Sequence, residues 1–155
     1  LNTQPLAEQL TCLGDGHDGV WNVFAEVGDE HQRLEILDWF HLKENLYKVG
    51  GSPQCLKQAE DDLWQGQVDA ALARFKGNQT DPLKRFHSYL EHHRERIVNY
   101  GYLQAEGFTI GSGAVESSIK QIDQRLKKTG AQWAYENVPQ VLRVRCAYLN
   151  GMLEV

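Results

Sequence analysis

Two carboxylates, Asp15 and Glu116, follow glycine-rich segments, and each could reach a bound divalent cation. Asp15 lies between Gly14 and Gly16, directly after the apolar residues 10–13. A carboxylate at a strand end, flanked by glycines, is accessible to Mg²⁺, which needs few protein carboxylates beside water and phosphate oxygens. The alternative is ordinary turn chemistry, in which the Asp15 side chain accepts a hydrogen bond from its own backbone.

Glu116 stands where the glycine-rich residues 111–113 turn into an amphipathic pattern that predicts a helix over residues 115–128. A carboxylate in the first turn of a helix interacts favourably with the helix dipole, so a purely structural role is one interpretation. In the other interpretation, the rigid helix points the carboxylate at a fixed spot, and the glycines before it let nucleic acid pass close by. The residues alone leave both interpretations open.

The elements that must position these side chains are two short strands and a long helical stretch. Apolar and β-branched residues predict strands at 10–13 and 33–37, with a short helix or turn at 20–25 between them. Helices are then predicted at residues 39–49, from 53 onward, at 81–100, at 115–128 and at 137–153. The charged run 91–96, which contains His92-His93, is predicted to be a solvated helix face.

Composition limits the class of protein. The 155 residues, 41% of them hydrophobic, are enough for one packed domain. No stretch approaches the ~20 apolar residues of a membrane span, and no secretory leader is recognisable, so we expect a cytoplasmic protein. Three widely spaced cysteines indicate neither a disulfide framework nor a zinc site.

The charge of the chain is unevenly distributed. A net charge of −5 argues against a simple electrostatic DNA binder, which needs clustered Lys and Arg side chains. After Glu116, however, six basic residues face three acidic ones, whereas the part up to Glu116 holds ten basic and eighteen acidic residues. The basic end could therefore face a polyanion, while the acidic part would repel one unless cations intervene.

Several ordered blocks resemble a family of bacterial insertion-sequence transposases of the DDE type, distant relatives of the Mutator-type elements. The blocks are Gly14-Asp15-Gly16, 37–41 (LDWFH), 44–46 (ENL), 111–117 (GSGAVES), 130–133 (GAQW) and 136–138 (ENV). The resemblance implies an α/β fold with helical excess, in which a partial RNase H-like core is interrupted by an α-helical insertion. The implied parts are core strands at 1–38, the insertion at 39–107 and core-closing helices at 108–155.

The resemblance also implies metal-dependent phosphodiester cleavage and strand transfer in DNA transposition. Such enzymes hold two divalent ions, Mg²⁺ or Mn²⁺, with three carboxylates. The second Asp of the family matches Asp15 and the Glu matches Glu116, with 100 residues between them. The ions activate the attacking oxygen and stabilise the leaving oxygen during in-line displacement. The implied partners are double-stranded DNA, as element ends and as target, and a second protomer in a synaptic complex associated with the nucleoid.

Further residues take roles through the same resemblance. Asp38-x-x-His41 matches a motif that such families carry after the second Asp, more often with Cys in the first position. His41 would lie near the scissile phosphate or would fix the strand-to-helix junction, and the sequence favours neither. Candidates for DNA contact are Lys120, Arg125, Lys127, Lys128 and Trp133. For Trp133, as for Trp64, a place in the hydrophobic core is the expected alternative.

One departure from the family concerns its first catalytic Asp, which lies on the opening strand of the core, well upstream of the Asp15 position. Only fourteen residues precede Asp15 here, too few for three strands. We therefore expect a fragment with part of an active site and without metal-dependent cleavage of its own. Two alternatives stay open: a non-catalytic transposase-derived remnant that binds DNA or protein, and an RNase H-like nuclease that cuts without joining.

Overall fold

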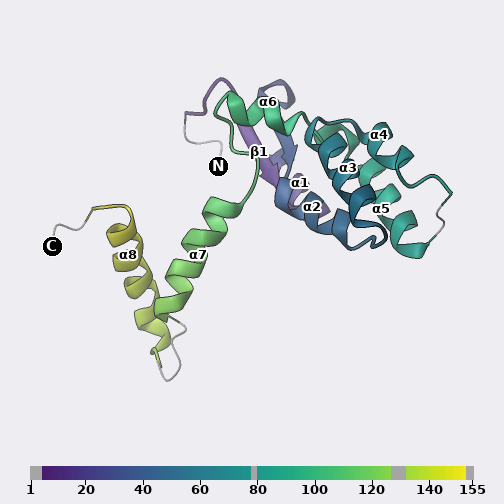
Figure 1. Cartoon of the computed structure of the whole chain (residues 1–155). Helices are drawn as coiled ribbons and strands as arrows, with labels where there is room; N and C mark the ends of the chain where they lie inside the picture. The colour runs from purple at the N-terminus through teal and green to yellow at the C-terminus, as the bar shows by residue number, and fades with distance from the viewer. Residues whose placement is uncertain (1–4, 78–79, 127–131, 153–155) are drawn as a thin grey trace. The chain divides into compact units, whose positions relative to one another are not determined.

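The computed structural model describes residues 5–77, 80–126 and 132–152 (Figure 1). The chain divides into two compact units, Leu1–Ser112 and Gly113–Val155. The first unit combines a small sheet with helices, and the second is helical over its described residues. The structure defines each unit by itself.

A strand, a helix and a second strand open the first unit. Strand β1 (Leu10–Gly14) pairs in parallel with strand β2 (Arg33–Leu37) in a two-stranded sheet. Helix α1 (Asp18–Ala25) and the 3-10 turn η1 (Glu30–Gln32) make the crossover that parallel strands require. Both predicted strands are confirmed, and the fold is α/β with a helical excess.

Helical segments make up the rest of the first unit. They are α2 (Trp39–Tyr47), α3 (Pro53–Trp64), α4 (Val68–Ala73), α5 (Asp81–His92), the 3-10 turn η2 (Arg94–Arg96) and α6 (Tyr100–Ala105). Pro53 and Pro82 lie in first turns, as predicted, because a backbone N–H is not needed there. Gly50 and Gly51 have φ angles of 71° and 106°, the left-handed conformation that lets the chain reverse after α2.

Aromatic side chains from three helices pack at the centre of the first unit. Trp39 lies edge-on to Trp64 with ring centroids 4.8 Å apart, and Tyr100 lies 5.0 Å from Trp39. The Tyr100 hydroxyl donates to the Leu37 carbonyl at 2.8 Å and so ties this cluster to the end of β2. Trp64 is therefore a core aromatic, as expected. Other buried core residues are Ile36, Leu42, Leu46, Ala59, Leu63, Ala71 and Leu90.

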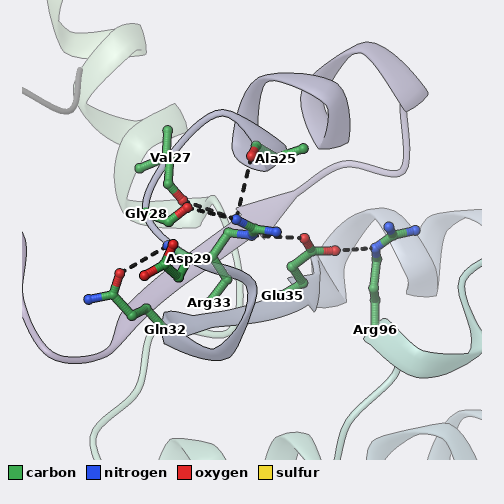
Figure 2. Close-up of polar contacts among 8 residues, drawn as sticks. All are labelled: Ala25, Val27, Gly28, Asp29, Gln32, Arg33, Glu35 and Arg96. Carbon is green, nitrogen blue, oxygen red and sulfur yellow. Dashed lines mark hydrogen bonds and ion pairs between the residues drawn. The ribbon is translucent and has the colours of Figure 1, made fainter.

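Arg33 fastens the end of α1 to the sheet (Figure 2). Its Nη1 donates to the backbone carbonyls of Val27 at 3.2 Å and Gly28 at 3.1 Å, and its Nε lies 3.6 Å from Glu35. Glu35 pairs in turn with Arg96 of η2 at 2.8 Å. These charged side chains therefore link α1, β2 and η2 in one network.

The predicted single helix over residues 81–100 is wrong, because α5 ends at His92 and the chain turns through η2 before α6 begins. The break directs two polar side chains inward. His93 is only 2% exposed, and the guanidinium of Arg96 lies 4.3 Å from the Trp21 ring centroid. The run 91–96 is therefore not a uniformly solvated face.

The second unit contains α7 (Gly113–Leu126), the 3-10 turn η3 (Tyr135–Asn137) and α8 (Val138–Leu149) among its described residues. Arg145 Nη2 donates to the Gln121 carbonyl at 3.5 Å, which joins α8 to α7. The two predicted helices are confirmed apart from their outermost residues, and residues 127–128 and 153 lie outside the described part. The predicted division at residues 38 and 107 stays a prediction.

Two further expectations concern disulfides and membrane spans. Cys12 is buried, Cys55 is half-buried and Cys146 is exposed, and all three cysteines are free. Within the described residues, no helix combines the length and the apolar character that crossing a membrane requires.

Candidate functional site

Asp15 and Asp38 occupy matching positions at the carboxyl edge of the sheet. Gly14 of β1 pairs with Leu37 of β2, and each of these residues is followed directly by one of the carboxylates. The Asp38 amide donates to the Gly14 carbonyl at 2.8 Å, which adds one hydrogen bond beyond the pair. Open α/β sheets bind their ligands outside the carboxyl ends of the strands, so this edge is the candidate site.

The Asp15 side chain is exposed and forms a local turn. Its Oδ1 accepts a hydrogen bond from the His17 amide at 2.9 Å. This is the turn chemistry that the sequence allowed, and it holds the carboxylate in one orientation. An exposed and oriented carboxylate at a strand end also suits a metal ligand, so the two interpretations of Asp15 are compatible.

Asp38 has the opposite environment, since it is only 1% exposed. Its Oδ1 accepts from the amides of Phe40 at 2.8 Å and His41 at 3.1 Å, which makes Asp38 the N-cap of α2, and its Oδ2 accepts from the Ser112 amide. Burial opposes the charge, but hydrogen bonds from Ser112 and the His41 amide outweigh it and hold the pKa of Asp38 below its usual value. Asp38 is therefore an ionised anchor of the strand-to-helix junction.

The Asp38 anchor holds residues 110–112 against the start of α2. The Trp39 amide donates to the Ile110 carbonyl at 3.0 Å, two residues before Ser112. A Cβ at Gly111 would lie 2.6 Å from the Phe40 ring, so any larger residue there would displace that ring. Close packing on α2 therefore explains part of the glycine-rich pattern before Glu116.

The His41 side chain lies beside the anchor without sharing its hydrogen bonds. Its Nδ1 is 3.4 Å from Asp38 Oδ1, and this buried nitrogen has no hydrogen-bond partner among the described residues. The side chain as a whole is 36% exposed. Asp38 therefore fixes the junction between β2 and α2. The position of His41 near the scissile phosphate stays a prediction.

Tyr89 of α5 lies beneath the turn that carries Asp15. Gly16 has a φ of 94°, and a Cβ on it would lie 2.9 Å from the Tyr89 hydroxyl oxygen. Burial, with smaller contributions from the charges of Asp15 and Asp38, raises the pKa of Tyr89 to about 12. Tyr89 is therefore a neutral support for the turn, close to both carboxylates.

His93 supports the same turn from the break after α5. Its ring packs edge-on against Tyr89 with centroids 4.8 Å apart, and its Nε2 would lie 3.3 Å from a Cβ on Gly16. Burial lowers the pKa of His93, and the nearby charges of His92 and Arg96 lower it further, although a hydrogen bond to the Gly16 backbone opposes them. Sequence reasoning missed both supports, and the glycines around Asp15 were the only signal of close packing there.

A hydrogen-bonded contact between Asp18 and His92 lies beside the turn. Asp18 Oδ1 lies 2.9 Å from His92 Nε2, and this hydrogen bond lowers the pKa of Asp18. His17 caps α1, because its Nδ1 accepts from the Gly19 amide at 3.1 Å. Across the part of the chain that the structure describes, no group of three or more His, Cys, Asp or Glu side chains is arranged to hold a metal ion.

The residues predicted to contact DNA belong to the second unit. Lys120 is exposed on α7, and Trp133 is 45% exposed rather than part of a core. Arg125 belongs to α7, with its side chain outside the described part, and Lys127 and Lys128 lie outside the described residues. Their contact with DNA stays a prediction.

Glu116 lies in the first turn of α7, as predicted, and its side chain is outside the described part. Asp15 belongs to the first unit and Glu116 to the second, so their pairing stays a prediction. Comparison with known proteins gave no matching family model, no matching curated protein and no matching solved structure. The resemblance to insertion-sequence transposases therefore rests on the ordered blocks of the sequence.

Proposed function

We propose that this chain is part of a DNA transposase that cleaves and joins phosphodiesters with bound divalent ions. The observation that carries the proposal is the exposed Asp15 carboxylate, oriented at the carboxyl end of a parallel strand. The segment that leads to Glu116 is anchored at the same edge, through the bond between Ser112 and Asp38. Glu116 follows Ser112 by four residues in the sequence.

The finer fold assignment belongs to the same proposal. We infer that β1, α1 and β2 are the end of an RNase H-like core, and that residues 39–107 are an α-helical insertion before core-closing helices. The parallel strand pair with its crossover helix supports the first inference. The helical character of the chain from α2 to α6 supports the second.

In this proposal Asp15 and Glu116 hold Mg²⁺ or Mn²⁺ through carboxylate oxygens, the ligands that these ions prefer. Asp38 stays outside the ligand set, because both its oxygens accept backbone hydrogen bonds in a buried place. The bound ions would activate the attacking oxygen and stabilise the leaving oxygen. The chain itself orients Asp15 through the His17 amide and holds Ser112 through Asp38.

Binding of Mn²⁺ to the 155-residue chain, followed by electron paramagnetic resonance, tests the metal assignment. Asp15→Asn and Glu116→Gln should each weaken binding roughly tenfold or more, which is about 1.4 kcal/mol. The control is Asp61→Asn, because Asp61 is a carboxylate of α3 with a 65% exposed side chain. Binding that is equal in the wild type and in both site variants would refute the assignment.

A non-catalytic remnant that binds DNA is the second candidate, favoured by the excess of basic residues after Glu116. Such a remnant would bind duplex DNA without holding Mn²⁺ at Asp15, so Asp15→Asn would change neither its DNA binding nor its Mn²⁺ binding. An RNase H-like nuclease would cut DNA without joining it. A pre-cleaved donor end, supplied to the parent protein and assayed for strand-transfer products, separates that nuclease from a transposase.

A further inference from the structure

Basic side chains gather around helix α5, within the acidic part of the chain. Lys84 and Arg85 are adjacent exposed residues of α5. Arg85 lines one surface hollow together with the exposed Lys48, which follows α2. Lys84 lines another together with the exposed Lys76, which follows α4. Four cationic side chains thus lie on α5 or beside it.

The hollow between α2 and α5 measures about 370 Å³. Its polar lining residues are Asn45 and Lys48 from the α2 side and Arg85 and Tyr89 from α5, and it contains no carboxylate among the described residues. Arg presents a planar fork of donors that matches phosphate oxygens, and Lys presents a compact positive charge. Facing cations of both types suit an anion such as a phosphate group.

The hollow between the end of α4 and α5 measures about 490 Å³. Its polar side chains are Lys76, Lys84, His87 and Ser88, all of them capable of donating hydrogen bonds. A third hollow, beside β2 and η2, is different, because it is lined by Glu30, Glu35, Glu91 and Glu95 as well as by arginines. Charge therefore favours a polyanion at α5 and disfavours one beside β2.

Carboxylates compete only weakly for these cations. Lys48 Nζ lies 3.5 Å from Glu44 and Lys84 Nζ lies 3.9 Å from Asp81, and all four side chains are more than 60% exposed. Exposed pairs of this kind contribute about 0–1 kcal/mol. For Lys76 and Arg85, the described residues provide no ion-pair partner.

The hollow between α2 and α5 reaches Tyr89, the residue that supports the Asp15 turn. The Tyr89 hydroxyl oxygen would lie 2.9 Å from a Cβ on Gly16, the residue after Asp15. Only the Tyr89 side chain would therefore separate an anion in the hollow from the Asp15 turn.

Helix α5 has 12 residues and is about 18 Å long. This length equals the axial rise of roughly five base pairs of duplex DNA.

We propose that the outer face of α5, with the hollow on each side of it, binds the phosphate backbone of double-stranded DNA. The choice of DNA as the polyanion rests on the proposed function, but the contact itself needs no metal ion. In this arrangement the helical stretch presents DNA to Asp15, in addition to separating Asp15 from Glu116 in the sequence.

The salt dependence of duplex binding tests the proposal. The logarithm of the association constant falls linearly with log[salt], and each lost phosphate contact reduces the magnitude of that slope by about 0.9. Binding is followed by fluorescence anisotropy with a labelled duplex in EDTA. The double variants are Lys48→Ala with Arg85→Ala, and Lys76→Ala with Lys84→Ala. Each should lower the slope by about 2 and weaken binding roughly tenfold or more at low salt.

Lys57→Ala is the matched control, because its side chain on α3 is 60% exposed and that of Lys84 is 62% exposed. It should leave the slope unchanged. The charge-conserving pair Lys48→Arg with Arg85→Lys should retain the slope, and circular dichroism checks that each variant is folded. Unchanged slopes in folded double variants, or an equal loss in Lys57→Ala, would overturn the proposal.

The Mn²⁺ measurement separates this proposal from the proposed function. If Asp15→Asn loses Mn²⁺ binding while the α5 variants keep the wild-type slope, the DNA surface is refuted and the metal assignment stands. If the α5 variants lose slope while Asp15→Asn binds Mn²⁺ normally, the DNA surface stands and the metal assignment falls.

Discussion

The Asp38 carboxylate accepts a hydrogen bond from the backbone amide of Ser112, 74 residues further along the chain. The same carboxylate caps α2 through the amides of Phe40 and His41. One buried side chain thus ties together the end of β2, the start of α2 and the segment that enters α7. Backbone N–H groups buried without a partner are costly, so the fold depends on this acceptor.

Replacing Asp38 with alanine should lower the free energy of unfolding by about 2–4 kcal/mol. Loss of an N-cap costs about 1 kcal/mol, and a buried donor left without an acceptor costs about 1–3 kcal/mol. Urea denaturation followed by circular dichroism measures the change. Asp61→Ala, at an exposed carboxylate of α3, should cost less than about 0.5 kcal/mol. Equal losses in the two variants would contradict the anchor role of Asp38.

Gly16→Ala should destabilise the chain more than Gly50→Ala, although both glycines have positive φ angles of 94° and 71°. A Cβ on Gly50 meets nothing within 4 Å, so only backbone strain of about 1–2 kcal/mol applies. A Cβ on Gly16 also meets Tyr89 and His93, which adds about 1–3 kcal/mol. Thermal unfolding of both variants measures the difference. If Gly50→Ala loses as much, the Asp15 turn does not rest on α5.

Tyr100→Phe should lower the free energy of unfolding by about 1–2 kcal/mol. The variant keeps the ring packing against Trp39 but removes the hydroxyl that donates to the Leu37 carbonyl at 2.8 Å. Urea denaturation measures the loss, and Tyr135→Phe is the control because Tyr135 is 91% exposed. A wild-type midpoint for Tyr100→Phe would show that the Leu37 carbonyl finds another donor.

Local signals in the sequence predicted the strands and most helix starts. Pro53, Pro82 and the Gly50-Gly51 pair act within a few residues, so their effect can be read without the fold. The strand that ends just before Asp15 was predicted from its apolar residues, and the turn hydrogen bond of Asp15 follows from the Asp-Gly pattern.

The contacts that complete the candidate site depend on the packing of distant segments. The bond between Asp38 and Ser112 spans 74 residues, and no local pattern indicates it. The support of Gly16 by Tyr89 and His93 was missed for a similar reason. Apolar residues recur on both sides of His93, so a periodicity of helical type hid the break after α5.

The burial of His93 makes a pH-dependent contribution to stability. Burial lowers the pKa of His93 in the folded chain below the unfolded value of about 6.5. Above about pH 6.5 the imidazole is neutral in both states, so its contribution is fully present. As the pH falls below that value, the unfolded chain takes up a proton more readily, and stability is lost until the pH passes the folded pKa.

His93→Gln should therefore flatten the pH dependence of the free energy of unfolding between about pH 7 and pH 5. In that window the wild type should lose up to about 1.4 kcal/mol more per pH unit than the variant. Asp38, whose pKa is also lowered, loses its contribution only below about pH 4, so the two effects are separable. Urea titrations at several pH values measure the slopes, with the exposed His87→Gln as control. Parallel curves for the wild type and His93→Gln would show that a buried neutral His93 does not contribute to folding.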